Sequence, residues 1–438
     1  MKLKSLVSTP TRLALVCIAG YLIILGIVAE NQPWGRGWWH DFTHYIKQKS
    51  TSYTPPDENS PEMAALQKKI DAWYPQILER YPLLKVEYKN VPDDQNGFLK
   101  ILEWQEDAEV MEKWEQTNLP DKFTAIWQSE NKKNAFPDNT LSEAKAYLKK
   151  HQPSLERAMK IGLLPNQSNA GISPDRFYFT SIPFTKNITD HLKLKACIEN
   201  EEGDLKSAFQ TFRAINGWAD HLGEIETPTL ILTTLSMAIR LSSQSLIHSR
   251  ILPQLPNNKN HSKQWEPWIK LITLKNDVSK NFLHMWRGEW QHVVHVTWVK
   301  VELLRINLQD YEALLTAYTE DLYDRIDIQT LFTPKSTPLR THDHLSRKSL
   351  LTLDLLNLGI SACASGYLRS HTILRQYQIA FALKKLEAEG HDLTQLDSTT
   401  LDSLPTQILP DLRLTIDFKQ RQITAPKNII PNPKTISF

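Results

Sequence analysis

The sequence is poor in glycine and cysteine, and it has no excess of charge of either sign. Its 438 residues include 14 glycines, too few for a fold of many tight hairpins or phosphate-binding loops. Three cysteines exclude a disulfide-stapled scaffold by number alone. The formal net charge of +2 gives no basic surface of the kind that nucleic-acid binding requires. No nucleic acid is therefore expected as a partner.

Several catalytic motifs are also missing. The Gly-x-Ser-x-Gly elbow, the Walker phosphate loop, Gly-x-Gly-x-x-Gly and His-Glu-x-x-His do not occur in the sequence. Ser142 and Lys145 have the Ser-x-x-Lys spacing of penicillin-interacting serine enzymes, but the companion Ser-Asp-Asn and Lys-Thr-Gly motifs are absent. These absences remove the commonest hydrolase and nucleotide-binding hypotheses. No catalytic residue and no cofactor is predicted, and an enzyme is the less favoured interpretation.

What the sequence does contain is one uncharged apolar run, residues 13–29. At about 1.5 Å per residue, a helix of this length spans most of a hydrocarbon core of about 30 Å. Lys2, Lys4 and Arg12 precede the run, and Glu30 follows it. Because positive residues stay on the cytoplasmic side, we expect a single-pass helix in a bacterial inner membrane. The bulk of the chain then lies in the periplasm or otherwise outside the cytoplasm.

A cleaved signal peptide is the alternative to an uncleaved signal-anchor. The apolar core of a signal peptide usually has 7–15 residues, fewer than the run 13–29, and cleavage prefers a small residue where Ile27 stands. The anchor is therefore favoured, and a mature chain that starts at Glu30 would contradict it. Aromatic residues follow the run and predict an interfacial belt, with a small buried cluster as the alternative: Trp34, Trp38, Trp39, Phe42 and Tyr45.

Beyond the anchor, helical periodicity alternates with proline-containing breaks. One helix after Pro61 has an apolar stripe that includes Leu66, Ile70 and Trp73. A long helical stretch is predicted over 264–305, and two more helices over 343–366 and 367–389, the last of which Gly390 stops.

At the far end, Leu412, Leu414 and Ile416 alternate with polar residues, as in a strand, and Gln420 and Arg421 predict a turn into a second short strand through Ile423. The predicted fold is mostly α, with a short C-terminal β segment. The predicted segments are a cytoplasmic N-terminus (1–12), the transmembrane helix (13–29), an aromatic juxtamembrane segment and linker (30–60), an N-terminal mainly helical domain (61–162), a connecting loop (163–187), a helical-hairpin domain (188–400), and a β segment with a flexible tail (401–438).

Residues 196–212, ACIENEEGDLKSAFQTF, resemble the junction of a tetratricopeptide-like helical hairpin. Gly203 permits the turn, Asp204 caps the second helix, and Ala196 and Ala208 permit close approach of the two helices. One copy is present, whereas a repeat solenoid needs three or more. The wider layout is similar to that of uncharacterised bacterial envelope proteins with an N-terminal anchor, a helical middle and a short C-terminal β segment. That family has no known activity, so the resemblance assigns no functional residue.

Four residues on one predicted helix are candidate metal ligands: His284, Glu289, His292 and His295. Glu289 and His292 have the Glu-x-x-His spacing of half a di-iron carboxylate site, but no second copy occurs. His292 and His295 share a helix face, so a zinc pair is the other metal hypothesis. The favoured alternative is an amphipathic helix with histidines in a packed, partly polar interface.

Other residue groups allow two interpretations each. The sequence 342–344 is His-Asp-His, which either includes a helix N-cap at Asp343 or begins a metal site. Cys197 and Cys363 either form a disulfide or are buried thiols, the commoner state of lone cysteines. Five tryptophans either pack in the core or form a stacking platform for glycans or peptides, and core packing is favoured: Trp265, Trp268, Trp286, Trp290 and Trp298.

Three functional hypotheses remain. The favoured one is a membrane-tethered envelope scaffold or protein-binding module, held by residues 13–29 and partnered by another envelope protein. The second is a metal-dependent envelope enzyme built around the four residues between 284 and 295. The third is a cell-wall glycan binder that uses the tryptophans.

Overall fold

The computed structural model describes residues 61–128, 140–178, 181–256, 263–274, 278–296, 311–324, 342, 344–345, 347–409, 412–426 and 435–438. Helices make up most of these residues, which confirms the predicted mostly-α class. The helices are α3 (Pro61–Arg80), α4 (Gly97–Gln105), α5 (Ala108–Gln116), α6 (Asp121–Gln128), α7 (Thr140–Lys150), α8 (Gln152–Gly162), α9 (Pro174–Tyr178), α10 (Ile182–Glu201), α11 (Leu205–Gly223), α12 (Leu230–Leu246), α13 (Glu266–Ile272), α14 (Val278–His295), α16 (Tyr311–Asp324), α18 (Arg347–Ala388) and α19 (Ser398–Ser403).

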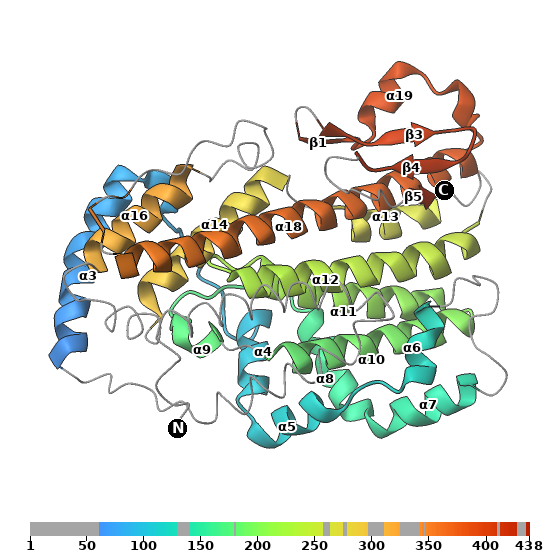
Figure 1. The fold of residues 1–438 in the computed structure, drawn as a ribbon. Helices are drawn as coiled ribbons and strands as arrows, with labels where there is room; N and C mark the ends of the chain where they lie inside the picture. Colours follow the sequence, from blue (N-terminus) through green and yellow to red (C-terminus); the bar gives the residue numbers. More distant parts are fainter. Residues whose placement is uncertain are drawn as a thin grey trace, which may run out of the picture.

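The longest element is α18, a helix of 42 residues. Figure 1 shows it running along α12, with α11 and α10 in the layers below, α3 and α16 near one end, and the β segment near the other. The sequence predicts a break in this stretch at Gly366, but the helix continues through it. It ends at Ala388, and Gly390, the predicted stop, follows in the turn with a φ of 91°. The N–H of His391 donates to the carbonyl of Leu386 across this turn.

Two apolar cores lie side by side in the body. The first joins α3, α14, α16, α18 and the β segment, and the predicted apolar stripe of α3 lies in it. The second joins α4, α5, α8, α10, α11, α12 and α13. Each core therefore contains residues from both sides of the predicted connecting loop 163–187. That stretch itself contains α9 and the start of α10, whose N-cap is Ser181.

The hairpin of α10 and α11 has the predicted turn. Gly203 adopts a φ of 77°, a conformation that glycine reaches without strain. The Asp204 carboxylate accepts the N–H of Ser207 at 3.0 Å and so caps α11. Ala208 is fully buried. The predicted glycine turn and aspartate cap are therefore present, while the tetratricopeptide-like arrangement stays a prediction.

One stretch of the described chain, Leu230–Gln254, is long and apolar enough to cross a membrane by length and composition. It comprises α12, a π-helical turn (Ile247–Ile251) and a short 3-10 turn. In its most apolar window, 61% of the residues are buried inside the molecule, as in a core helix. The predicted membrane helix, residues 13–29, lies outside the described residues.

The β segment ends the described chain. Strands β3 (Thr415–Asp417) and β4 (Gln422–Thr424) pair antiparallel, and the turn between them contains Arg421 with a φ of 54°. The last residues of the tail that was predicted to be flexible form a strand, β5 (Thr435–Ser437), which pairs with β4. Ile436 is 4% exposed, so burial of an apolar side chain accompanies this pairing. A second small sheet joins β1 (Gln407–Leu409) and β2 (Leu412–Arg413).

Candidate functional site

All four predicted metal ligands lie on α14, but they do not converge. Glu289 accepts the N–H of Leu230 at 3.0 Å, at the first turn of α12. The Nε2–H of His292 donates to the carbonyl of Thr227 at 3.2 Å. His295 packs edge-on against the ring of Tyr74, with the ring centroids 4.9 Å apart. Two of the four thus fasten α14 to the segment that joins α11 to α12.

The remaining candidate, His284, has its Nδ1 3.4 Å from the guanidinium of Arg287. Within the described residues, no group of three or more His, Cys, Asp or Glu side chains is placed to hold a metal ion. The predicted metal site is therefore not assembled in this part of the chain. The favoured alternative, histidines in a partly polar helix interface, agrees with these contacts.

Burial sets the protonation of these side chains. It lowers the pKa of His292 to about 4 against the opposing effect of the Thr227 carbonyl. It also lowers the pKa of His284 to about 4, and the nearby Arg287 adds to the effect. Burial raises the pKa of Glu289, although the Leu230 N–H opposes the change. Both histidines are therefore neutral at pH 7 and serve as hydrogen-bonding groups.

The loop of residues 225–229 is the centre of a second set of contacts, which the sequence does not reveal. The carboxylate of Glu226 accepts the Lys89 N–H at 3.1 Å, the Ser168 hydroxyl at 3.0 Å and the Asn169 N–H at 2.9 Å. Glu226 is 4% exposed, and its three donors satisfy the buried charge. This loop therefore joins α14 to the segments around residues 89 and 168.

A small cavity lies between α11, α12, α14 and α18. Its volume is about 20 Å³, which is room for a single water molecule. The buried guanidinium of Arg240 lines it and pairs with the carboxylates of Asp220 and Glu224. A cavity of this size has room for water and carries no argument for a substrate site.

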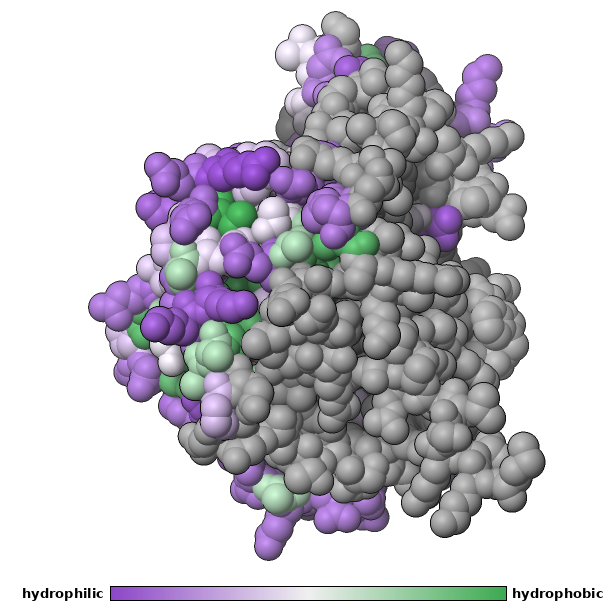
Figure 2. Space-filling view, turned by 60° about the vertical axis from the view of Figure 1, so that its left-hand side comes forward, coloured by the Kyte–Doolittle hydropathy of each residue, from purple (hydrophilic) through white to green (hydrophobic). Residues whose placement is uncertain are grey.

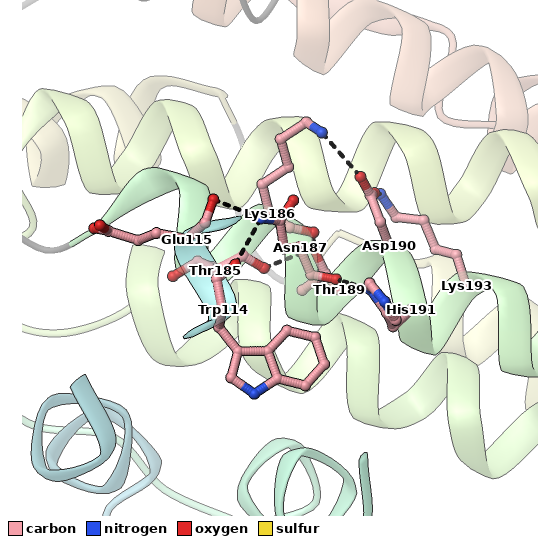
Figure 3. A network of polar contacts seen from close by, with 9 residues as sticks. All are labelled: Trp114, Glu115, Thr185, Lys186, Asn187, Thr189, Asp190, His191 and Lys193. Carbon is pink, nitrogen blue, oxygen red and sulfur yellow. Dashed lines mark hydrogen bonds and ion pairs between the residues drawn. The ribbon is translucent and has the colours of Figure 1, made fainter. Parts of the chain in front are cut away.

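Figure 3 shows another buried polar network, centred on α10. Asp190 accepts from Lys193 at 2.8 Å and from Lys186 at 3.1 Å. Burial alone would raise the pKa of Asp190, but the two lysines outweigh it and hold the pKa far below its usual range. The side-chain amide of Asn187 donates to the carbonyl of Trp114 at 2.7 Å, which fixes α5 against α10.

His191 extends this network to α7. Its Nδ1–H donates to the carbonyl of Asn187 at 2.7 Å, and its Nε2 accepts the hydroxyl of Tyr147 at 2.8 Å. Burial lowers the pKa of His191 to about 4, against the effect of the Asn187 carbonyl. The ring is therefore neutral at pH 7. It joins two helices through hydrogen bonds and does not act as an acid.

An open pocket of about 240 Å³ lies where the start of α4 meets the last turn of α8. Its lining residues are Asp94, Lys100, Arg157, Lys160, Ile161 and Leu164. The guanidinium of Arg157 lies 4.8 Å from the ring centroid of Trp104. This surface hollow, which we name the α4–α8 pocket, is large enough for a side chain or a small anion. Neither the helical periodicity nor any motif indicates it.

The tryptophans confirm core packing where the structure describes them. Trp286 and Trp290 are fully buried, and Trp265 and Trp268 are at most 4% exposed. The indole N–H of Trp290 donates to the hydroxyl of Thr319 at 2.9 Å. A glycan platform made of these side chains is therefore wrong. Trp298 lies outside the described residues.

The other candidate residues take part in local packing and pairing, and the rings of His342 and His344 lie edge to face, 5.9 Å apart. His342 donates to the buried carboxylate of Asp321 at 2.9 Å, while Asp343 lies outside the described residues. Lys145 pairs with Glu202 on the surface. Cys197 is a buried free thiol, and burial raises its pKa to about 12. The buried-thiol interpretation is confirmed for this cysteine.

The described surface is mixed in character. On the face drawn in Figure 2, hydrophilic side chains surround small apolar areas among the coloured residues. The exposed large hydrophobic side chains of the described chain are Leu83 and Tyr88.

Comparisons with known proteins find no matching family model, no matching curated protein and no matching solved structure.

Proposed function

We propose that this chain is a membrane-tethered envelope scaffold that binds another protein through its helical body. The observation that carries the proposal is that the buried polar side chains form contacts within the body, whereas the exposed charged side chains surround an open pocket. Glu226, Glu289 and His292 fix segments of the body to one another, whereas Arg157 and Lys160 of the α4–α8 pocket are exposed to solvent. A rigid helical body with an open charged pocket suits the binding of another protein better than catalysis.

The membrane tether in this proposal is the uncharged run 13–29, with the positive residues Lys2, Lys4 and Arg12 before it. The chain then crosses a bacterial inner membrane once, and the helical body lies on the periplasmic side. Residues 30–60 provide an aromatic segment and a linker between the bilayer and the body.

Membrane fractionation tests the tether. If the run 13–29 is an uncleaved anchor, alkaline carbonate leaves the chain in the membrane pellet, and mass spectrometry finds the N-terminal residues in the mature protein. Release of the chain into the soluble fraction, with a mature N-terminus at Glu30, would contradict the anchor.

Crosslinking in membranes tests the binding function. A tagged full-length chain, treated with a short crosslinker before solubilisation, is expected to carry a second protein through purification. A matched sample in which the body, residues 61–438, is replaced by an unrelated soluble domain controls for capture through the anchor. Equal recovery with both samples, or no partner above background, would contradict the proposal.

The enzyme alternative lacks a supporting observation among the described residues. One carboxylate oxygen of Glu289 accepts the backbone N–H of Leu230, and the Nε2–H of His292 donates to the carbonyl of Thr227. Metal analysis of the purified full-length chain tests this point independently. A stoichiometric metal ion that is lost in Glu289→Gln and His292→Gln would revive the enzyme hypothesis.

A further inference from the structure

We propose that the α4–α8 pocket binds an acidic side chain of the partner protein. The inference rests on the proposed function and adds the chemistry by which the partner is recognised. It depends on three cationic residues, on the rigid placement of their helices, and on the size and apolar lining of the pocket.

The cations come from two helices. Arg157 and Lys160 are three residues apart on α8 and therefore share a face, and Lys100 faces them from α4. Lys100 also pairs with Glu103 at 2.8 Å. Arg157 and Lys160 are exposed, and no ion pair joins either of them to another residue in the described part of the chain. The pocket thus presents two cations whose charge is not neutralised there.

Arg157 is oriented for a carboxylate. Its guanidinium lies over Trp104 at 4.8 Å, and Trp104 is itself buried, with 2% of its surface exposed. The aromatic face restrains the side chain by a cation–π contact. The N–H groups at the edge of a stacked guanidinium stay available, and their fork matches the two oxygens of a carboxylate.

The helix that carries Arg157 and Lys160 is fixed against α11. The indole of Trp218 donates to the carbonyl of Ala158 at 2.9 Å, and the Nε2–H of His221 donates to that of Ile161 at 2.9 Å. A methyl group on Gly217 would lie 1.7 Å from the carbonyl oxygen of Gly162, so the two helices touch along their backbones. The pocket therefore exists before a partner arrives, which reduces the entropy lost on binding.

The dimensions favour a single side chain. A volume of about 240 Å³ is below the range of about 300–1,000 Å³ that is usual for small-molecule sites. Ile161 and Leu164 form an apolar part of the lining, which suits the methylene groups of a glutamate. Its carboxylate would then lie among the cations.

An anionic membrane surface is the less favoured occupant. Recognition of anionic lipids usually needs clusters of about 4–8 Lys or Arg residues, and this pocket has three. Asp94, which also lines the pocket, would repel a plane of phosphate groups. A protein partner can place a backbone N–H or a cationic side chain beside Asp94 and so satisfy it.

The test uses the full-length chain in detergent and a fluorescent peptide rich in glutamate, with the glutamine version of the peptide as its control. Fluorescence anisotropy is expected to detect binding of the glutamate peptide and no binding of the glutamine peptide. Arg157→Gln combined with Lys160→Gln is expected to weaken this binding about tenfold or more, because hydrogen bonds to charged groups are the stronger class.

The matched control is Lys149→Gln combined with Lys206→Gln, which removes two cations from exposed positions on α7 and α11. It is expected to leave the affinity within about twofold of the original chain. Both double variants are expected to fold, because all four side chains are exposed. Thermal unfolding of the two variants checks this. Equal weakening by the two double variants would overturn the proposal, because the attraction would then be non-specific.

Two further results would also overturn it. One is the failure of the glutamate peptide to bind better than the glutamine peptide. The other is binding of monomeric dihexanoylphosphatidylglycerol, lost in the Arg157/Lys160 variant, without any binding of the peptide. A protein recovered equally by the original chain and by this variant would leave the proposed scaffold function standing and remove only the pocket's role.

Discussion

Glu289 on α14 and Leu230 at the first turn of α12 are 59 residues apart in sequence and are joined by one hydrogen bond of 3.0 Å. The backbone N–H of Leu230 donates, and the carboxylate accepts. A carboxylate at this position also interacts favourably with the positive end of the α12 dipole. The residue that the sequence offers as a metal ligand is thus an additional cap of a core helix.

Replacement of Glu289 by alanine is expected to lower the free energy of unfolding by about 1–3 kcal/mol, because the N–H of Leu230 loses its acceptor. Glu289→Gln keeps an acceptor oxygen and is expected to lose less. Urea denaturation, followed by circular dichroism, measures both. Equal losses in the two variants would contradict the capping role.

Stability is expected to fall as the pH drops from about 6.5 to about 4. The folded-state pKa is lowered to about 4 for His191, His284 and His292, whereas the unfolded chain titrates near 6.5. The unfolded state therefore binds more protons in this window, and stability is greatest above it. Urea midpoints measured from pH 7.5 to pH 4 should decrease accordingly.

The same measurement on His292→Asn should give a shallower pH dependence, since one titrating group has been removed. His344→Asn is the control, because His344 is exposed. Identical slopes for the original chain and for His292→Asn would show that the ring of His292 does not carry this linkage.

Gly217→Ala is expected to destabilise the protein by about 1–3 kcal/mol or more. The new methyl group would lie 1.7 Å from the Gly162 carbonyl oxygen, and backbone atoms cannot move aside as a side chain does. Gly203→Asn is the control, since nothing lies within 4 Å of its Cβ position and asparagine tolerates a positive φ. Thermal unfolding of both variants compares them. A Gly217→Ala protein as stable as Gly203→Asn would contradict the close crossing of α8 and α11.

Arg421→Gln is expected to raise the pKa of Glu387 and to loosen the edge of the small sheet. Arg421 pairs with both carboxylate oxygens of Glu387, at 2.8 and 2.9 Å, and donates to the Phe438 carbonyl at 2.9 Å. The Arg421 hydrogen bonds are the main reason that the pKa of Glu387 falls to about 2. Hydrogen exchange at residues 422–424 should accelerate. Unchanged exchange would show that β5 holds the edge without this arginine.

Local structure follows closely from the sequence. The apolar stripe of α3, including Leu66, Ile70 and Trp73, is buried as its spacing predicts. The turn at Gly203 and the pairing of Ile416 with Ile423 also follow from nearby residues. In each case the residues that determine the structure lie close together in the sequence, so the local sequence pattern is enough to predict it.

Helix ends are less well determined. The predicted long helix over 264–305 is α13 and α14, two helices in the described part of that range, whereas the predicted break in α18 does not occur. Both differences arise where propensity is weak and tertiary packing decides whether a helix continues.

The candidate metal site depends even more on tertiary packing, which the sequence does not reveal. Their spacing places Glu289 and His292 three residues apart on α14, but it cannot say which segment lies opposite them. Their partners are backbone groups of residues 227 and 230, which carry no side-chain signal. The α4–α8 pocket likewise exists only because Trp218 and His221 hold α8 in place.

The sequence by itself determined the helical class, the apolar faces, the Gly203 turn and the antiparallel pairing of β3 and β4. Tertiary structure alone decided that the α14 side chains fasten a loop and that Lys100, Arg157 and Lys160 surround one hollow. The physical reason is that burial and backbone conformation are governed by short-range periodicity, whereas a site depends on contacts between segments that only packing brings together.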